Sequence, residues 1–162
     1  MITSIWRLCV SLSAFVLLPI STAQACAFHM AEQDSLMSFQ TANYQHTLAL
    51  TIETNLALKN GTIEPLEKPL SGEAGFRQIS WWLHLLAQEL SLKELPTSQV
   101  VIIDVPLWSD YQKGRSRMAE IDTPRPKNNE PIIALTQATL YSLVSKKIDL
   151  VQAIEQGLVR VN

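Results

Sequence analysis

A chain of 162 residues with a formal net charge of −2 is long enough to bury one hydrophobic core. Its slightly acidic balance argues against a nucleic acid as the partner. After the first 25 residues, no apolar run is long and charge-free enough to cross a bilayer.

Residues 1–25 have the pattern of a secretory signal peptide. Arg7 is their only charge, Leu8–Ile20 is apolar, and a small-x-small cleavage motif ends at Ala25. The apolar run is shorter than the roughly 20 residues that a membrane-spanning helix needs. We therefore predict cleavage after Ala25, a periplasmic or secreted location, no transmembrane anchor in the mature protein, and one domain formed by residues 26–162.

Cleavage at this point would leave Cys26 as the first residue and the sole cysteine, so no internal disulfide is possible. Its α-amine and thiolate can chelate a metal ion, and His29 can add an imidazole, with His46 as a third side-chain ligand. Thiolate and imidazole together suit zinc or copper. Two other interpretations stay open. Cys26 is the acylated residue of a lipoprotein, although Ala23 stands where such signals prefer leucine, or it is a plain chain terminus beside an exposed His29.

Two helices are predicted in the first half of the domain. Thr41–Asn60 fits a helix better than a strand, because it is long, contains alanine and ends before Gly61. Apolar residues recur in it at i, i+4 spacing: Tyr44, Leu48, Ile52 and Leu56. After a loop at Thr62–Gly75, Phe76–Leu92 has the strongest helical stripe of the chain, formed by Phe76, Ile79, Leu83, Leu86 and Leu90.

Aromatic residues provide a candidate ligand site. Trp81 and Trp82 are adjacent in the second helix, and Trp108 and Tyr111 follow a predicted strand, Val100–Val105. These four side chains can line an apolar pocket. In the alternative interpretation, one indole packs in the core and the other covers the surface.

The segment around that strand contains two further features. Asp104 interrupts the apolar run and either points into a cleft or faces solvent at the strand end. The polar segment Lys113–Pro131 is rich in basic residues and is either a solvated loop or a contact for anionic lipid or phosphate. Met118–Ile121 within it is a candidate short strand.

The end of the chain, Ile132–Val161, has the most consistent local signals. We predict a strand at Ile132–Leu135, a helix capped by Thr136, a short helix at Leu150–Glu155 capped by Asp149, a left-handed residue at Gly157, and a strand at Leu158–Val161.

Leu140–Val161 resembles the closing segment of sterol-carrier-protein-2-like (SCP2-like) domains, in which a helix, a Lys-Ile-Asp turn, a short helix with alanine, a glycine and a strand follow one another. The resemblance implies an apolar ligand tunnel. This chain has Lys146 where the family pattern has glycine, and it has no residues after Asn162 where the family continues. A second resemblance, to exported bacterial proteins with Cys-Ala-Phe-His and Ser-Trp-Trp-Leu segments, implies no activity.

Together these features predict an α+β fold: N-terminal helices followed by a small antiparallel sheet with the C-terminal helix packed on it. The sequence contains no recognisable catalytic motif, which favours a non-enzymatic binding protein for an apolar or lipid-like ligand. The alternatives are a metal-binding or metal-delivery protein that uses the N-terminal Cys-x-x-His, and a structural or interaction module without a small ligand.

Overall fold

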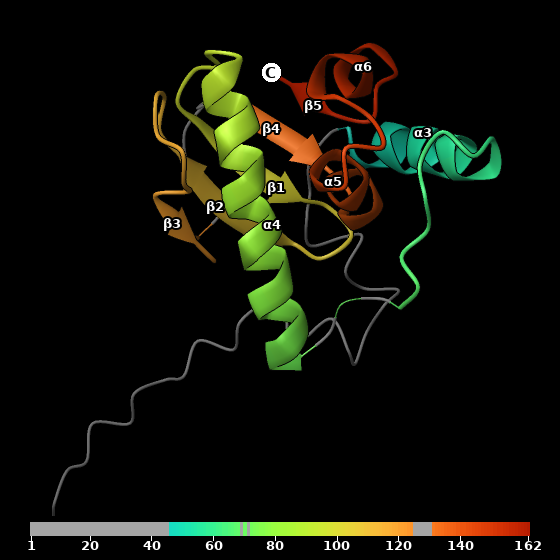
Figure 1. Ribbon diagram of the computed structural model, residues 1–162, viewed down its shortest axis with the longest axis horizontal. Helices are drawn as coiled ribbons and strands as arrows, with labels where there is room; N and C mark the ends of the chain where they lie inside the picture. Colours follow the sequence, from blue (N-terminus) through green and yellow to red (C-terminus); the bar gives the residue numbers. More distant parts are fainter. Residues whose placement is uncertain (1–45, 69, 71, 125–130) are drawn as a thin grey trace, which may run out of the picture.

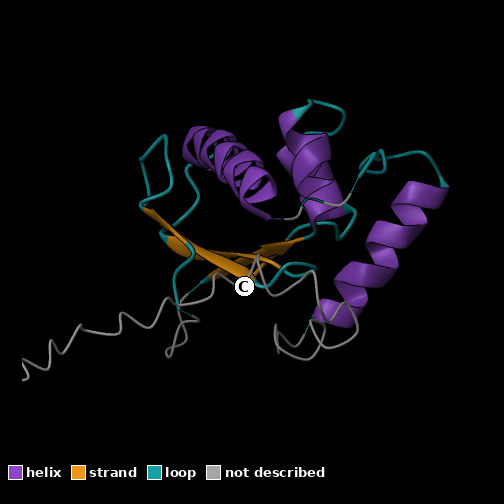
Figure 2. Ribbon diagram, turned by 90° about the horizontal axis from the view of Figure 1, so that it is seen from below, coloured by secondary structure: helices purple, strands orange, loops and turns teal. Residues whose placement is uncertain are grey.

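The computed structural model describes residues 46–68, 70, 72–124 and 131–162, in which helices pack against a five-stranded sheet (Figures 1 and 2). The α+β class predicted from the sequence is confirmed. None of the described helices is long and apolar enough to cross a membrane. The helices are α3 (Thr47–Lys59), α4 (Gly72–Leu92), α5 (Gln137–Val144) and α6 (Leu150–Glu155); the strands are β1 (Ser98–Ile102), β2 (Leu107–Tyr111), β3 (Glu120–Ile121), β4 (Ile132–Leu135) and β5 (Arg160–Val161).

The sheet is mixed, in the order β3-β2-β1-β4-β5, so the expectation of an antiparallel sheet is wrong at one pairing. β1 and β4 are parallel, with Gln99 opposite Ile132 and Ile102 opposite Leu135, whereas the other three pairings are antiparallel. The chain adds β2 and β3 on one side of β1 and then returns to place β4 on its other side. Short apolar runs do not reveal this direction, because a buried strand has the same pattern with either kind of neighbour.

The β1–β2 hairpin differs from the prediction for the same residues. β1 ends at Ile102, and Ile103–Pro106 form a turn instead of extending the strand. Leu107–Tyr111, expected as aromatic cover, is the second strand of the hairpin. Successive side chains of this strand point to opposite faces of the sheet. Leu107 and Tyr111 therefore lie in the main core, and Trp108 lies in a second cluster with Leu50, Val101, Ile103 and Ala134.

α4 covers the sheet through the stripe that the sequence predicts. Ile79, Leu83 and Leu90 have no exposed surface, and Leu86 is 1% exposed. The helix begins at Gly72 instead of Phe76, inside the region expected to be a loop. It packs beside α5 above the sheet, as the side view in Figure 2 shows, so the main core lies between these two helices and the strands.

α3 is a helix, as the sequence favours, but the face that it buries is not the one with the i, i+4 stripe. Its buried residues are Leu50, Thr54 and Ala57. The opposite face carries the stripe residues, and these are exposed: Leu48 at 72%, Ile52 at 49% and Leu56 at 48%. The helix is therefore apolar on both sides, and periodicity alone does not identify the packed face.

The C-terminal segment has the predicted local structure. The Thr136 hydroxyl caps α5 by accepting the Thr139 backbone N–H at 3.2 Å. Asp149 caps α6 in a reciprocal capping box with Gln152. Gly157 has φ +72°, a conformation that favours glycine, and a Cβ there would lie 3.1 Å from an Arg160 guanidinium nitrogen. The closing strand is shorter than expected, because only Arg160–Val161 pair with β4.

Candidate ligand cleft

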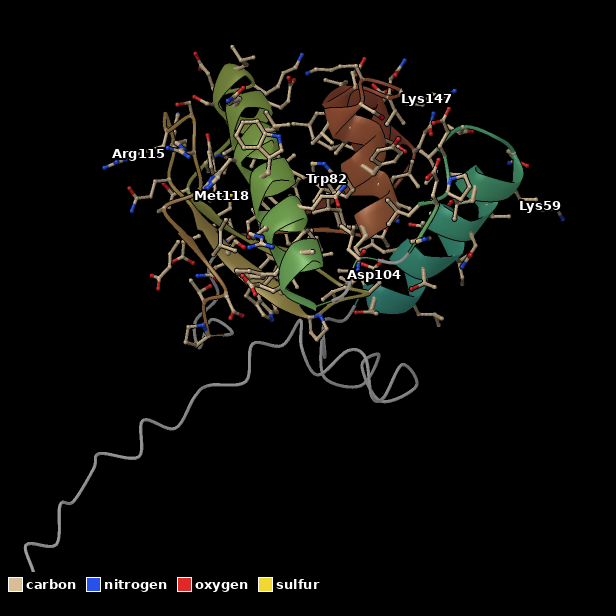
Figure 3. All side chains as sticks on the ribbon, turned by 60° about the horizontal axis from the view of Figure 1, so that its bottom comes forward. Lys59, Trp82, Asp104, Arg115, Met118 and Lys147 are labelled. Atoms are coloured by element: carbon tan, nitrogen blue, oxygen red, sulfur yellow. The ribbon has the colours of Figure 1, made fainter. Side chains whose placement is uncertain are left out.

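The candidate site is a cleft between α4, α5 and the segment that joins α3 to α4. Trp82 projects from α4 toward α5, as Figure 3 shows, and its ring centroid lies 5.3 Å from that of Tyr141 at an interplanar angle of 41°. Tilted aromatic pairs at this distance are attractive, by about 1 kcal/mol beyond the area that they bury. The two rings therefore form a rigid apolar wall.

The rest of the cleft comes from the α3–α4 segment and from Gln78 of α4. Its volume is about 310 Å³, and its lining residues are Leu66, Glu67, Lys68, Leu70, Gln78, Trp82 and Tyr141. This volume is at the lower end of the range for small-molecule sites, which begins at about 300 Å³. Leu66 and Leu70 extend the apolar wall, while the two charged residues and Gln78 supply polar groups beside it. The lining therefore offers apolar and polar surface in about equal measure.

Contacts between α5 and the α3–α4 segment position the cleft. The Glu64 backbone N–H donates to Ser142 Oγ at 3.4 Å, and its carboxylate accepts a hydrogen bond from Lys147 Nζ at 2.8 Å. This hydrogen bond and the charge of Glu64 raise the pKa of Lys147. Both side chains are about half exposed, so the pair orients the segment more than it stabilises the fold.

The structure separates the four aromatic residues that the sequence nominates as ligand-binding. Trp82 is the only one of them that lines the cleft. Trp81 is 59% exposed, Trp108 packs with Val101 and Ala134 in the second cluster, and Tyr111 is fully buried in the main core. Tyr141 is the aromatic partner that the sequence analysis missed. Its spacing indicates only a helical core position, and no local signal pairs it with a residue on α4.

The predicted metal ligands are mostly outside the described residues. Cys26 and His29 both lie there, and His46 is placed at the N-cap of α3, partly buried. In the part of the chain that the structure describes, no three histidine, cysteine or acidic side chains gather into a group that could hold a metal ion. A zinc or copper site at the N-terminus stays a prediction from the sequence.

Asp104 lies in the β1–β2 turn at the N-terminus of α5. Its two carboxylate oxygens accept the Gln137 backbone N–H at 3.0 and 3.2 Å. Burial raises the pKa of Asp104 to about 6, against the opposing effect of backbone hydrogen bonds from Gln137 and from the turn itself. Asp104 therefore neither faces solvent at a strand end nor lines the Trp82 cleft. Its carboxyl group is instead buried and caps α5.

Tyr111 provides a test of the core packing. Its hydroxyl is buried and has no hydrogen-bond partner among the described residues, and the same holds for Ser109 Oγ on the same strand. A buried polar atom without a partner costs about 1–3 kcal/mol, so removing it relieves that cost. We expect Tyr111→Phe to raise the free energy of unfolding in urea by about 1 kcal/mol, with Ser109→Ala as a second case. A loss of stability in both variants would show that these hydroxyls have partners.

Comparison with known proteins gives partial structural likenesses. No family model and no curated protein matches the chain. A double mutant, S233Y F250G, of the sec-alkyl sulfatase PisA1 matches 56% of this chain and 14% of its own, at 21% identity and a TM-score of 0.34. The stereoselective inverting sec-alkylsulfatase Pisa1 from Pseudomonas sp. matches 49% and 12%, at 23% identity and a TM-score of 0.32. The chain thus spans about one-seventh of these enzymes, and matches of this size assign it neither a fold family nor an activity.

Proposed function

We propose that the protein is an exported, non-enzymatic binding protein that holds a small apolar or lipid-like molecule in the Trp82 cleft. The observation that carries the proposal is the aromatic wall of Trp82 and Tyr141 beside a space of about 310 Å³. A ligand there would displace water from two rings and two leucines, and each square ångström of apolar surface removed from water contributes about 25 cal/mol.

Two further features support this proposal. Glu67, Lys68 and Gln78 stand beside the apolar wall, and a few polar groups around an apolar site are what orient a bound small molecule. In addition, Tyr141 lies within Leu140–Val161, the segment that resembles the end of SCP2-like domains. The resemblance and the cleft therefore involve the same helix, α5.

The cleft can be blocked without disturbing the core. Gln78 is exposed on α4 and lines the cleft, whereas Gln88 is exposed on the same helix and does not line it. We expect Gln78→Phe to weaken binding of the apolar fluorescent probe 1-anilinonaphthalene-8-sulfonate at least about tenfold, a change of ~1.4 kcal/mol. Gln88→Phe should leave the affinity unchanged, as measured by probe emission during titration of folded protein.

Two results would contradict the proposal. Equal affinities in the wild type and in both variants would place the probe elsewhere on the protein. Equal weakening by both variants would point to a general change in α4 instead of a specific cleft. Extraction of protein from the exporting host with organic solvent gives an independent check, because a bound apolar molecule should appear in the wild-type extract and be depleted from Gln78→Phe.

A further inference from the structure

A second surface of α4 combines exposed apolar side chains with unpaired positive charge. Trp81 and Leu92 are exposed by 59% and 76% and belong to one stripe of the helix, at i and i+11. Single exposed apolar residues are common on soluble proteins. Here, however, the helix that carries them lies beside the loop between β2 and β3, which contacts α4 through His84 (Figure 1).

That loop carries three cations and no acid. Lys113, Arg115 and Arg117 are all exposed, and none of them forms an ion pair with a described carboxylate. We call these three residues, with Trp81 and Leu92, the basic–aromatic patch. Although the whole chain has a net charge of −2, the Debye length is only about 10 Å at 0.1 M salt, so distant acids do not cancel a local charge of this kind.

Backbone hydrogen bonds fix the conformation of this loop. The Arg115 backbone N–H donates to the Gln112 carbonyl at 3.0 Å, closing a tight turn in which Gly114 has φ +78°. The Lys113 backbone N–H donates to Thr97 Oγ1 at 3.1 Å on one side of the turn. The tip is therefore a hydrogen-bonded turn that carries three exposed positive charges.

A hydrogen bond on the other side of the turn joins the loop to α4. The backbone N–H of Met118, which is buried in the main core, donates to His84 Nδ1 at 3.2 Å. Burial and the nearby Arg117 guanidinium lower the pKa of His84, which places Arg117 beside this helical turn. Trp81 is one turn before His84 on the same face, so the indole and the cations share one side of the molecule.

We propose that the basic–aromatic patch docks on a membrane surface that contains anionic phospholipids. Tryptophan sits favourably at the boundary between head groups and acyl chains, Leu92 can enter the acyl region, and the basic residues can contact lipid phosphates. The aliphatic Leu92 favours a bilayer over a nucleic acid, where stacking needs aromatic or guanidinium planes. This surface is separate from the Trp82 cleft, because neither Trp81 nor Leu92 lines that cleft.

The test is co-sedimentation of the purified protein with vesicles made of equal parts phosphatidylcholine and phosphatidylglycerol. Each basic side chain near an anionic surface is worth roughly a fivefold change in partitioning, so neutralising all three with Lys113→Gln, Arg115→Gln and Arg117→Gln should weaken it about a hundredfold. Arg115→Gln alone should weaken it about fivefold. Lys59→Gln is the matched control, since Lys59 and Arg115 are at opposite ends of the molecule (Figure 3).

Tryptophan emission supplies a second readout. Trp81 is the exposed indole among the three described, since Trp82 and Trp108 are 8% and 6% exposed. Vesicles should therefore shift wild-type emission to shorter wavelength, and Trp81→Phe should abolish the shift.

Three results would overturn the proposal. The first is a partition coefficient that the triple variant leaves unchanged. The second is equal weakening by Lys59→Gln and Arg115→Gln. The third is tighter binding to single-stranded DNA than to the anionic vesicles. All four substituted basic residues are exposed, so circular dichroism of each variant should match the wild type.

Discussion

Leu83→Ala is expected to lower the free energy of unfolding by about 3 kcal/mol. Losses for such core substitutions range over about 2–5 kcal/mol. Leu83 has no exposed surface and lies at the centre of the main core, where its removal leaves a cavity between α4 and the sheet. The loss combines the transfer free energy of the deleted groups with the cost of the cavity, because the packed neighbours relax only in part.

Leu92→Ala is the matched control for this prediction. Leu92 is on the same helix and is 76% exposed, so its truncation should change stability by no more than about 0.5 kcal/mol. Urea unfolding followed by circular dichroism measures both variants. Similar losses in the two would mean that α4 does not pack on the sheet through the face described above.

Asp104→Asn is expected to change how stability depends on pH. The folded protein raises the pKa of Asp104 from 3.8 to about 6, so protonation of this group favours the folded state. The stabilisation is fully present below about pH 4 and is lost as the pH rises toward about 6. A shift of about two pKa units corresponds to about 3 kcal/mol.

An asparagine in this position would keep an oxygen that accepts the Gln137 N–H but would not ionise. Between about pH 4 and pH 7, the stability of the Asp104→Asn variant relative to wild type should therefore increase by about 3 kcal/mol. All other ionisable groups are common to both proteins, so their contributions cancel in the difference. Parallel stability curves across this range would contradict the buried position of the carboxyl group.

The features that sequence patterns predicted well are those set by neighbours in the chain. The Thr136 and Asp149 caps each depend on the backbone N–H three residues further along the chain. Glycine is favoured at position 157 by its own positive φ. The α4 stripe repeats over about four turns, long enough for its buried face to be identified from periodicity.

Features that depend on distant residues could not be predicted in this way. The stripe of α3 was visible, but the helix instead buries Leu50, Thr54 and Ala57. Their partners lie far along the chain, as for the Thr54 hydroxyl, which is 3.3 Å from that of Thr136. To predict the parallel β1–β4 pairing, one would need to know on which side of β1 the chain returns.

The candidate site was predicted only in part for the same reason. Trp82, which the sequence nominates for a ligand pocket, borders the cleft, but its partner Tyr141 belongs to a helix far along the chain. Trp108 was nominated with it because aromatic residues cluster in the sequence. Strand alternation instead sends Trp108 to the second cluster, away from the main core that contains Tyr111.

The central claim is that the cleft beside Trp82 receives a small apolar ligand, and the three described indoles report on it separately. They lie in the cleft, on the outer face of α4 and in the second cluster. The most direct measurement is a titration with 1-anilinonaphthalene-8-sulfonate followed by the indole N–H signals in nitrogen–proton correlation NMR, each assigned by a Trp→Phe substitution. The proposal predicts that the Trp82 signal shifts and saturates while that of Trp108 stays in place, and any response of Trp81 reports on the basic–aromatic patch and not on the cleft. A saturable shift of Trp81 or Trp108 with no change at Trp82 would contradict it.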